Sequence, residues 1–237
     1  MKLKALGSSS SGNCYLLDDG KQILILEAGV PFSDVKEAID YQTNRIVAVI
    51  YTHSHLDHSK YIYEYKDSCI PVIDGRTVEQ FGRTILPPWR IGKFSISPFS
   101  VKHDVPCFGY QIEHPDMGKL IFVTDAEYCK YTFPGVNHIM VEANYAQDII
   151  DENVNNGDIP KSLRDRIMKS HMSVDTAKGI VKANSNHMLR NVILLHLSSH
   201  NSDKKRFISE VSELAGPYCN VEAAYKGLEV NLDLYPF

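Results

Sequence analysis

The sequence predicts an α/β fold in which helices cover the outside of a β-sheet structure. Short apolar runs rich in β-branched residues, such as 46–51 and 120–124, have the length of buried strands. They alternate with segments of helical character, and two runs near the N-terminus are separated by a tight turn. The chain has 237 residues, of which 43% are hydrophobic, and contains no linker-like segment. We therefore expect one large soluble domain spanning residues 1–237.

The individual elements are expected from periodicity and turn residues. Residues 15–17 and 22–26 predict a β-hairpin, and Ser33 is the expected N-cap of the helix that follows it. The remaining expected elements are a strand at 46–51, helices from about 57 and near 60–65, a strand at 71–73, a helix at 77–81, strands at 93–99, 108–113, 120–125 and 191–196, and a helix after Ser173.

Composition excludes some classes of protein. The apolar runs are too short to span a membrane, and the N-terminal segment 1–12 lacks the apolar stretch of a signal peptide. Five cysteines without a C-x-x-C pair fit a reducing compartment better than a disulfide framework. We therefore expect a cytoplasmic protein without a membrane partner, and no protein partner can be inferred. The net charge of −4 gives no overall attraction to nucleic acid.

Four potential metal ligands fall within residues 53–58, which read His-Ser-His-Leu-Asp-His directly after the apolar run 46–51. In an extended segment His53 and His55 lie on the same side, so both imidazoles can bind one ion. Asp57 and His58 come just after them, where a turn can direct them to a second ion. Divalent metals such as zinc favour this mixture of imidazole and carboxylate. The alternative interpretation is a histidine-rich surface loop.

At these residues the chain resembles the metallo-β-lactamase-fold hydrolases, and Ser-Gly-Asn-Cys at 11–14 resembles their YycJ/WalJ-like branch. The resemblance implies a four-layer αββα sandwich of two mixed sheets with outer helices. It also implies two divalent metal ions per chain, zinc first and manganese as the other candidate. The implied ligands are His53, His55 and His103 for one ion, Asp57, His58 and His196 for the other, and Asp125 as the bridge.

One residue departs from the pattern of this branch. Glu27 stands where the branch carries an aspartate that supports the metal-binding histidines. A glutamate is one methylene longer, so its supporting role is left open by the sequence.

Further residues are candidates for catalysis and substrate binding. Asp57 and His171 are the expected catalytic residues, His171 because it resembles an extra histidine that nuclease-like members place over the scissile phosphate. The alternatives are a structural His171, hydrogen-bonding loop residues at Glu142 and Asn144, and a flexible linker at 7–12. The expected substrate contacts are Ser11, Asn13, Glu142, Asn144, Arg164 and Asn201.

These residues favour one class of reaction. Two divalent ions lower the pKa of a shared, bridging water and so supply hydroxide at neutral pH. Cationic residues precede His171 and favour an anionic substrate; they are Lys161, Arg164, Arg166 and Lys169. The sequence therefore predicts a dinuclear-metal-dependent phosphodiesterase with a nucleic-acid substrate and an exonuclease-like action. The alternatives are an ester or thioester hydrolase of the glyoxalase II type, and a catalytically silent metal-binding protein that binds nucleic acid or a partner.

Overall fold

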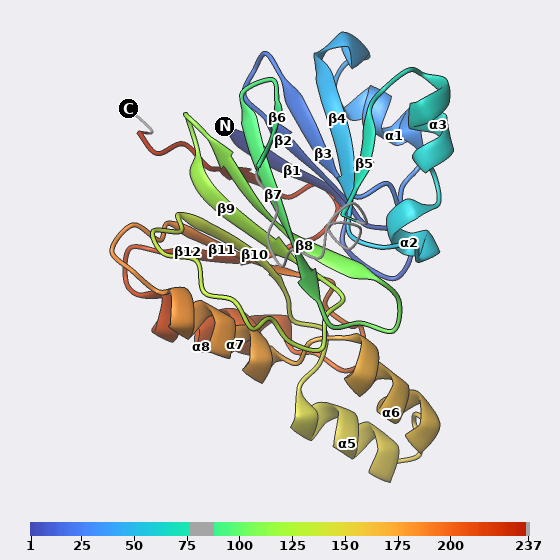
Figure 1. Ribbon diagram of the computed structural model, residues 1–237. Coiled ribbons are helices and arrows are strands. Elements are labelled where there is room, and N and C mark those ends of the chain that lie inside the picture. The colour runs from blue at the N-terminus through green and yellow to red at the C-terminus, as the bar shows by residue number, and fades with distance from the viewer. Residues whose placement is uncertain (76–87, 236–237) are drawn as a thin grey trace.

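The computed structural model of the chain describes residues 1–75 and 88–235, which form two β-sheets with helices on their outer faces (Figure 1). The first sheet has the strand order β13-β1-β2-β3-β4-β5. Its strands are β1 (Lys2–Gly7), β2 (Cys14–Asp18), β3 (Ile23–Leu26), β4 (Ile46–Tyr51), β5 (Val72–Asp74) and β13 (Glu229–Asn231). In this sheet β3, β4 and β5 run parallel, whereas β1 pairs antiparallel with both of its neighbours.

The second sheet has the strand order β12-β11-β10-β9-β8-β7-β6. Its strands are β6 (Trp89–Ile91), β7 (Phe94–Val101), β8 (Cys107–His114), β9 (Gly118–Val123), β10 (His138–Glu142), β11 (Asn191–Leu195) and β12 (Asn220–Ala223). The strands β9 to β12 run parallel, and β6, β7 and β8 form an antiparallel meander. Both sheets are therefore mixed.

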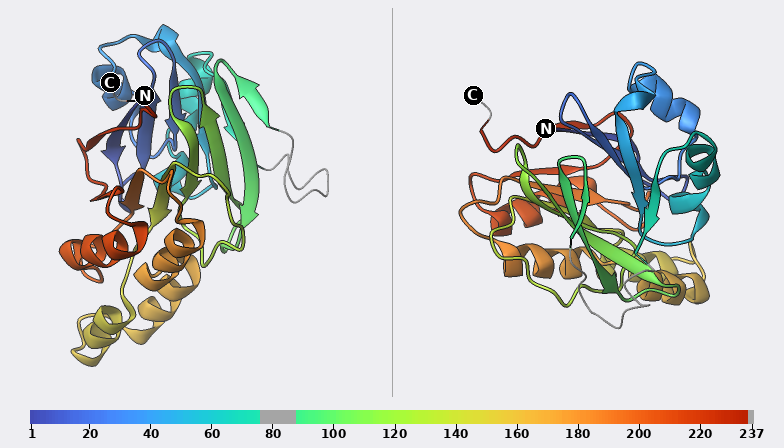
Figure 2. Two further views of the ribbon diagram at one scale, coloured as in Figure 1. Left: turned by 90° about the vertical axis from the view of Figure 1, so that its left-hand side faces the viewer. Right: turned by 45° about the horizontal axis from the view of Figure 1, so that its top comes forward.

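The helices fall into three groups (Figure 2). The helices α1 (Phe32–Ala38), α2 (Leu56–Ser59) and α3 (Ile62–Asp67) lie on the side of the first sheet, with a short 3-10 turn, η1 (Thr43–Arg45). The helices α7 (Val174–Asn184) and α8 (Lys204–Ala215) cover the outer face of the second sheet. The helices α5 (Gln147–Asn155) and α6 (Lys161–Ser170) project from the body as a hairpin, which we call the arm.

Three apolar layers hold these elements together. One fills the space between the sheets and includes Leu24, Phe122 and Ile193. A second lies between the second sheet and α7 and α8, and a third between the first sheet and α1 and α3. Helix, sheet, sheet and helix therefore stack in four layers, and the predicted four-layer sandwich is confirmed.

Most of the predicted elements are present, although one predicted N-cap is wrong and several observed elements, among them α5, β12 and β13, were not expected. The N-terminal hairpin forms as expected, with β2 antiparallel to β3. The predicted N-cap at Ser33 is wrong, because α1 begins at Phe32 and Pro31, two residues before Ser33, holds the cap position. Strand β1 occupies 2–7, where no strand was expected, because polar and small residues break its apolar pattern. The helix predicted at 77–81 lies outside the described residues.

Two expectations from composition concern compartments. All five cysteines are free. Within residues 1–75 and 88–235, no helix has the length and apolar character required to cross a membrane. The cytoplasmic location remains a prediction.

Candidate metal centre

The candidate site lies where five parallel strands end. Glu27 follows β3, His53 follows β4, Asp125 follows β9, and His196 follows β11, while Glu142 is the last residue of β10. Ligands in open α/β sheets bind at the carboxyl ends of the strands, because side chains from several strands converge there. Sequence segments that are far apart thus contribute to one site.

Three of these residues have left-handed backbone conformations. The φ angles are 69° at Glu27, 48° at Asp125 and 52° at His196. Such a conformation costs about 1–3 kcal/mol in a non-glycine residue, and it persists where surrounding contacts hold it. At His196 the backbone N–H donates to Ser8 Oγ at 2.9 Å. The backbone N–H of Glu27 donates to the Ile50 carbonyl at 2.8 Å.

One group of side chains consists of imidazoles alone. His53, His55 and His103 each offer a ring nitrogen, and these nitrogens lie within 4.8 Å of one another. His103 Nε2 is 3.3 Å from His55 Nδ1, and His53 is buried. The His53 ring centroid lies 4.6 Å from that of His55 and 4.7 Å from that of His103. We call this group the imidazole side.

A second group combines imidazoles with carboxylates. His58 Nε2 is 2.7 Å from Asp125 Oδ2 and 3.3 Å from Asp57 Oδ2. His196 Nε2 is 3.8 Å from Asp57 Oδ2, and His196 Nδ1 is 3.1 Å from Asp125 Oδ1. We call Asp57, His58 and His196 the carboxylate side.

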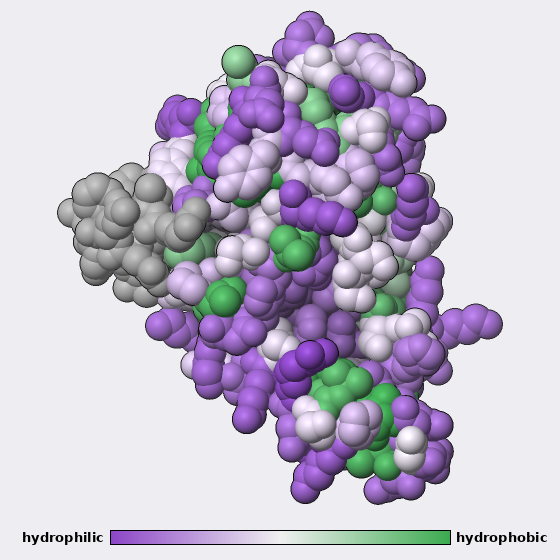
Figure 3. All heavy atoms as spheres, turned by 90° about the vertical axis from the view of Figure 1, so that its right-hand side faces the viewer, coloured by the Kyte–Doolittle hydropathy of each residue, from purple (hydrophilic) through white to green (hydrophobic). Residues whose placement is uncertain are grey.

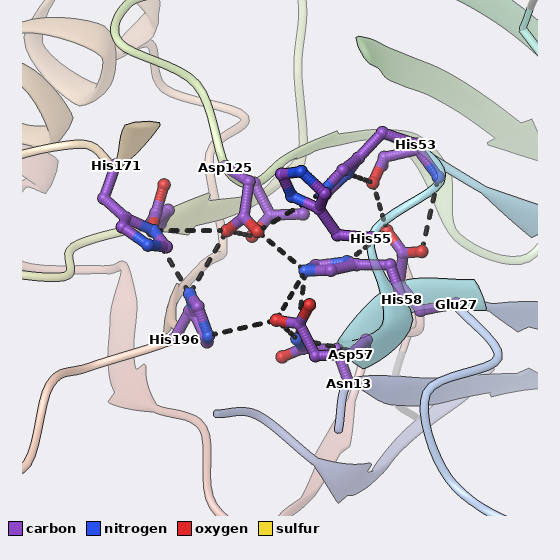
Figure 4. A network of polar contacts seen from close by, with 12 residues as sticks. Asn13, Glu27, His53, His55, Asp57, His58, Asp125, His171 and His196 are labelled. Carbon is purple, nitrogen blue, oxygen red and sulfur yellow. Dashed lines mark hydrogen bonds and ion pairs between the residues drawn. The ribbon is translucent and has the colours of Figure 1, made fainter. Parts of the chain in front are cut away.

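Asp125 lies between the two sides (Figure 4). Its Oδ2 faces both His58 and, at 3.7 Å, His53 Nε2, while its Oδ1 faces His196. Oδ2 thus faces one histidine of each side, and Oδ1 faces a second histidine of the carboxylate side. This is the position that a bridging ligand requires, although the bridge itself remains a prediction.

The residues fit divalent metal ions. His53 Nε2 on the imidazole side and His196 Nε2 on the carboxylate side are buried and have no hydrogen-bond partner among the described residues. An unsatisfied buried polar atom costs about 1–3 kcal/mol. Imidazole and carboxylate donors are the set that zinc and similar ions bind. A metal ion would use the lone pairs that the protein leaves without a partner.

Glu27 supports the imidazole side through a hydroxyl. Thr52 Oγ1 donates to Glu27 Oε1 at 2.7 Å and lies 2.9 Å from His53 Nδ1. Because the Thr52 hydrogen is used on the carboxylate, the hydroxyl oxygen accepts from His53 Nδ1–H, and Nε2 keeps its lone pair. Glu27 Oε1 also lies 3.3 Å from His58 Nδ1. The extra methylene of the glutamate therefore does not remove it from the histidines.

Glu142 has the corresponding place behind the carboxylate side. Its Oε1 lies 3.3 Å from His196 Nδ1 and 2.7 Å from His171 Nδ1, and its Oε2 accepts from the Met172 backbone N–H at 3.1 Å. His171 Nδ1 is also 3.6 Å from Asp125 Oδ1. Glu142 is fully buried, whereas the His171 side chain is 22% exposed. The carboxylate therefore holds one ring nitrogen of His171 while part of the ring remains accessible.

The two sides differ in their protonation. Burial lowers the pKa of His53 to about 2, and burial also lowers the pKa of His103. Burial acts the same way on His58, but the charges of Asp125 and Glu27 outweigh it and raise its pKa well above the usual value. The same competition, won by Asp125 and Glu142, raises the pKa of His196 to about 9.

Asp125 and His171 continue this pattern. Burial would raise the pKa of Asp125, but the imidazolium charges of His58 and His196 hold it well below its usual range. Burial would lower the pKa of His171, but Glu142 and Asp125 raise it to about 10.

The predicted substrate contacts lie in different surroundings. Asn13 is buried beside the carboxylate side, with Nδ2 3.4 Å from Asp57 Oδ2. Asn144 Nδ2 donates to the His196 carbonyl at 2.8 Å, so it fixes the backbone of a candidate ligand. Ser11 is exposed on the N-terminal loop. For these residues substrate contact remains a prediction.

Two other residues predicted to contact substrate, Arg164 and Asn201, bind residues of the arm. Arg164 binds Asp151 at 2.8 Å and Asp165 at 3.0 Å. Asn201 Oδ1 accepts from Asn153 Nδ2 at 2.8 Å. Their side chains therefore stabilise the arm and its attachment.

Sequence reasoning overlooked the supporting residues Thr52 and Ser8. Thr52 precedes the first histidine directly, and that position is the only signal that pointed to it. Nothing in the sequence indicates that the hydroxyl oxygen of Ser8, 188 residues before His196, accepts from the His196 backbone N–H.

The fold and the two facing groups of candidate ligands can be compared with those of known proteins. Residues 9–80 match the model of the metallo-beta-lactamase superfamily. Over 98% of its length the chain is 23% identical to "Exodeoxyribonuclease WalJ" of Streptococcus pneumoniae, of which 95% is covered.

Two solved structures have the same fold. One is the metallo-beta-lactamase fold protein YhfI from Bacillus subtilis, with a TM-score of 0.69 and 17% identity, covering 97% of this chain and 98% of YhfI. The other is the short form of human tRNase Z, with a TM-score of 0.60 and 14% identity, covering 98% of this chain and 99% of that protein. At these identities the likeness establishes the fold.

Proposed function

We propose that this protein is a metal-dependent phosphodiesterase that hydrolyses nucleic acid in an exonuclease-like manner. The observation that carries the proposal is the Glu142–His171 pair, in which His171 Nδ1 lies 2.7 Å from a buried carboxylate and 3.6 Å from Asp125. A partly accessible imidazole held beside the candidate ligands can give a proton to a leaving oxygen. The similarity to an exodeoxyribonuclease over 98% of the chain supports the same reaction.

The candidate ligands have distinct tasks in this proposal. His53, His55 and His103 would hold one divalent ion, Asp57, His58 and His196 the other, and Asp125 would contact both. When bound, such ions supply hydroxide at neutral pH and neutralise the charge that develops on a phosphate. Zinc is the first candidate and manganese the second.

His171 acts on the leaving group. Hydrolysis adds the hydroxyl of water to phosphorus and breaks the bond from phosphorus to the sugar oxygen, which then needs a proton. His171 supplies that proton from Nε2, and Glu142 stabilises the protonated ring through Nδ1. A proton donor positioned in this way contributes about 10²–10⁴-fold to the rate. Glu142 is therefore a positioning residue and His171 a catalytic one.

The acidic net charge does not oppose an anionic substrate. Figure 3 shows a hydrophilic hollow between the arm and the rest of the molecule. Bound divalent ions would make this hollow locally positive.

Turnover of end-labelled substrates tests the proposal. Single- and double-stranded DNA and RNA, labelled at the 5′ or 3′ end, are incubated with the full chain and zinc, manganese or magnesium. A ladder or a single-nucleotide product that depends on metal supports the proposal and gives the polarity. Turnover of a thioester or lactone without cleavage of any nucleic acid would instead indicate a hydrolase of the glyoxalase II type. Two bound ions with no turnover at all would indicate a silent binding protein.

A further inference from the structure

A small groove lies beside the candidate metal centre, between the segment that leads to His103 and the segment that leaves Asp125. The backbone N–H of Glu127 donates to the Lys102 carbonyl at 2.9 Å, so the two segments are joined next to the site. The groove has a volume of about 250 Å³. It is lined by Ser100, Val101, Lys102, Tyr128, Lys130 and Tyr131.

The groove combines an exposed aromatic ring with two cations. The Tyr128 side chain is 47% exposed, and Lys102 Nζ lies 6.0 Å from the centre of its ring. Lys130 Nζ lies 5.3 Å from the centre of the Tyr131 ring. Lys102 forms an exposed ion pair with Glu127, whereas Lys130 has no carboxylate partner in the part of the chain that the structure describes. Lys130 is thus the cation available to a ligand.

Tyr131 gives the groove a fixed wall. Its ring packs edge-on against Phe99, with 5.3 Å between ring centres and 65° between planes. Its hydroxyl is buried and has no hydrogen-bond partner within the described residues. An exposed tyrosine alone is common on protein surfaces. This groove adds a second ring and the Lys130 cation to the exposed Tyr128, and the two segments that line it continue to His103 and Asp125.

We infer that this groove binds the nucleotide next to the scissile phosphate in a single-stranded nucleic acid, with its base stacked on Tyr128 and its phosphate at Lys130. This inference rests on the proposed function. Proteins that hold single strands combine aromatic rings, on which bases stack, with cations along the backbone. Pockets for complete small molecules occupy about 300–1,000 Å³, so this smaller groove suits part of a longer ligand.

Binding and turnover of a single strand test the inference. A fluorescein-labelled single-stranded DNA of about ten nucleotides, within the usual range for such sites, is titrated with the full chain in EDTA, which stops metal-dependent cleavage. Tyr128→Ala should weaken binding by about 5- to 150-fold, the range measured when a stacking aromatic is removed. Tyr128→Phe keeps the ring and should bind within about twofold of the unaltered protein.

Two further variants separate the ring from the cation. Lys130→Ala should reduce the salt dependence of binding by about one unit of slope, because one phosphate contact is lost. Tyr218→Ala is the matched control, because Tyr218 is 94% exposed and precedes β12, at the end of the parallel strands opposite His196. It should bind like the unaltered protein. Unchanged binding by Tyr128→Ala would overturn the inference.

Turnover distinguishes this inference from the proposed function. With metal supplied, Tyr128→Ala should lower kcat/KM for the labelled strand by a similar factor, and the loss should be confined to that substrate when bis(p-nitrophenyl) phosphate is compared. Equal losses on both substrates would show that Tyr128 is structural, which contradicts the groove assignment. If the unaltered protein hydrolyses neither substrate but Tyr128→Ala still weakens binding, the proposed function fails and the groove assignment stands.

Discussion

The imidazole side and the carboxylate side of the candidate centre are built from the same residue type but in opposite electrostatic surroundings. On the imidazole side, burial dominates and lowers the pKa of His53 to about 2. On the carboxylate side, Asp125 and Glu142 reverse the effect of burial and raise the pKa of His196 to about 9. The contrast shows that burial alone does not determine the protonation state of a histidine, because nearby carboxylates can raise its pKa by more than burial lowers it.

The same contrast predicts different metal preferences. Apart from the shared Asp125, the imidazole side offers only nitrogen donors, whereas the carboxylate side adds an oxygen from Asp57. Nitrogen donors suit zinc and similar ions, and oxygen donors also suit harder ions such as manganese. The two positions should therefore differ in affinity.

The largest effect is expected from Asp125→Ala, because Asp125 is the candidate bridging ligand and faces histidines of both sides. Both ions should bind more weakly, and activity should be lost together with them. Metal analysis of reconstituted protein and competition with a chromophoric chelator measure the two affinities. His196→Ala is the matched variant and should weaken binding of the ion on the carboxylate side alone. If Asp125→Ala left one ion bound as tightly as before, the bridging assignment would be wrong.

His171→Ala tests the region next to the carboxylate side without removing a ligand. Two ions should remain bound, while kcat for a single-stranded substrate falls by at least about a hundredfold, because a proton donor is lost. The measurement combines metal content, thermal unfolding and single-turnover rate. The loss should be smaller with a substrate whose leaving group needs no proton, such as a p-nitrophenyl ester. Full activity, or a variant that does not fold, would exclude His171 from the mechanism.

The sequence pointed to the candidate ligands more directly than to the residues that support them. His53 to His58 stand in one short segment after an apolar strand, so spacing alone reveals them. Glu142, His171 and His196 come together only because β10 and β11 pair in parallel, which no local pattern specifies. Arg164 remains a predicted substrate contact, and its ion pair with Asp151 across the arm could not be foreseen without the packing of α5 on α6.

A smaller effect is expected from Thr52→Val, which keeps the shape of the side chain but removes the hydroxyl between Glu27 and His53. His53 then loses the acceptor that fixes its tautomer, and the affinity of the imidazole side should fall by about 10- to 100-fold. The affinity of the carboxylate side should change little, since Glu27 still contacts His58. Thr52→Ser restores the hydroxyl and should restore the affinity. Equal weakening of both ions by Thr52→Val would contradict the separation of the two sides.

His138 provides a buried histidine that belongs to neither side. Its Nε2 lies 3.0 Å from the Met117 carbonyl and its Nδ1 3.0 Å from Asn191 Nδ2, so both nitrogens are satisfied. Burial lowers its pKa from 6.5 to about 4. The unfolded chain therefore binds the proton more readily than the folded one. The free energy of unfolding is thus unaffected by His138 above pH 6.5 and declines as the pH falls from 6.5 toward 4. Between pH 7 and pH 5 the loss should be about 2 kcal/mol.

Denaturant unfolding at several pH values measures this loss. His138→Gln lacks the titrating group and should show a shallower decline over the same range than the unaltered protein. An identical decline in both proteins would show that other groups account for it.

The smallest effect is expected from Ser8→Ala, which acts on the carboxylate side through the backbone. Ser8 Oγ accepts from the His196 N–H at 2.9 Å and from the Tyr15 hydroxyl at 2.8 Å. Without it, the left-handed conformation of His196 loses one of the contacts that hold it. Stability should fall by about 1 kcal/mol, which lowers Tm by roughly 2–4 °C for a chain of this size. Affinity for the ion on the carboxylate side should fall by about fivefold, while affinity for the ion on the imidazole side should not change. Ser10→Ala is the control, because Ser10 is exposed on the same loop. Equal losses in the two variants would mean that the loop, and not the Ser8 hydrogen bond, positions His196.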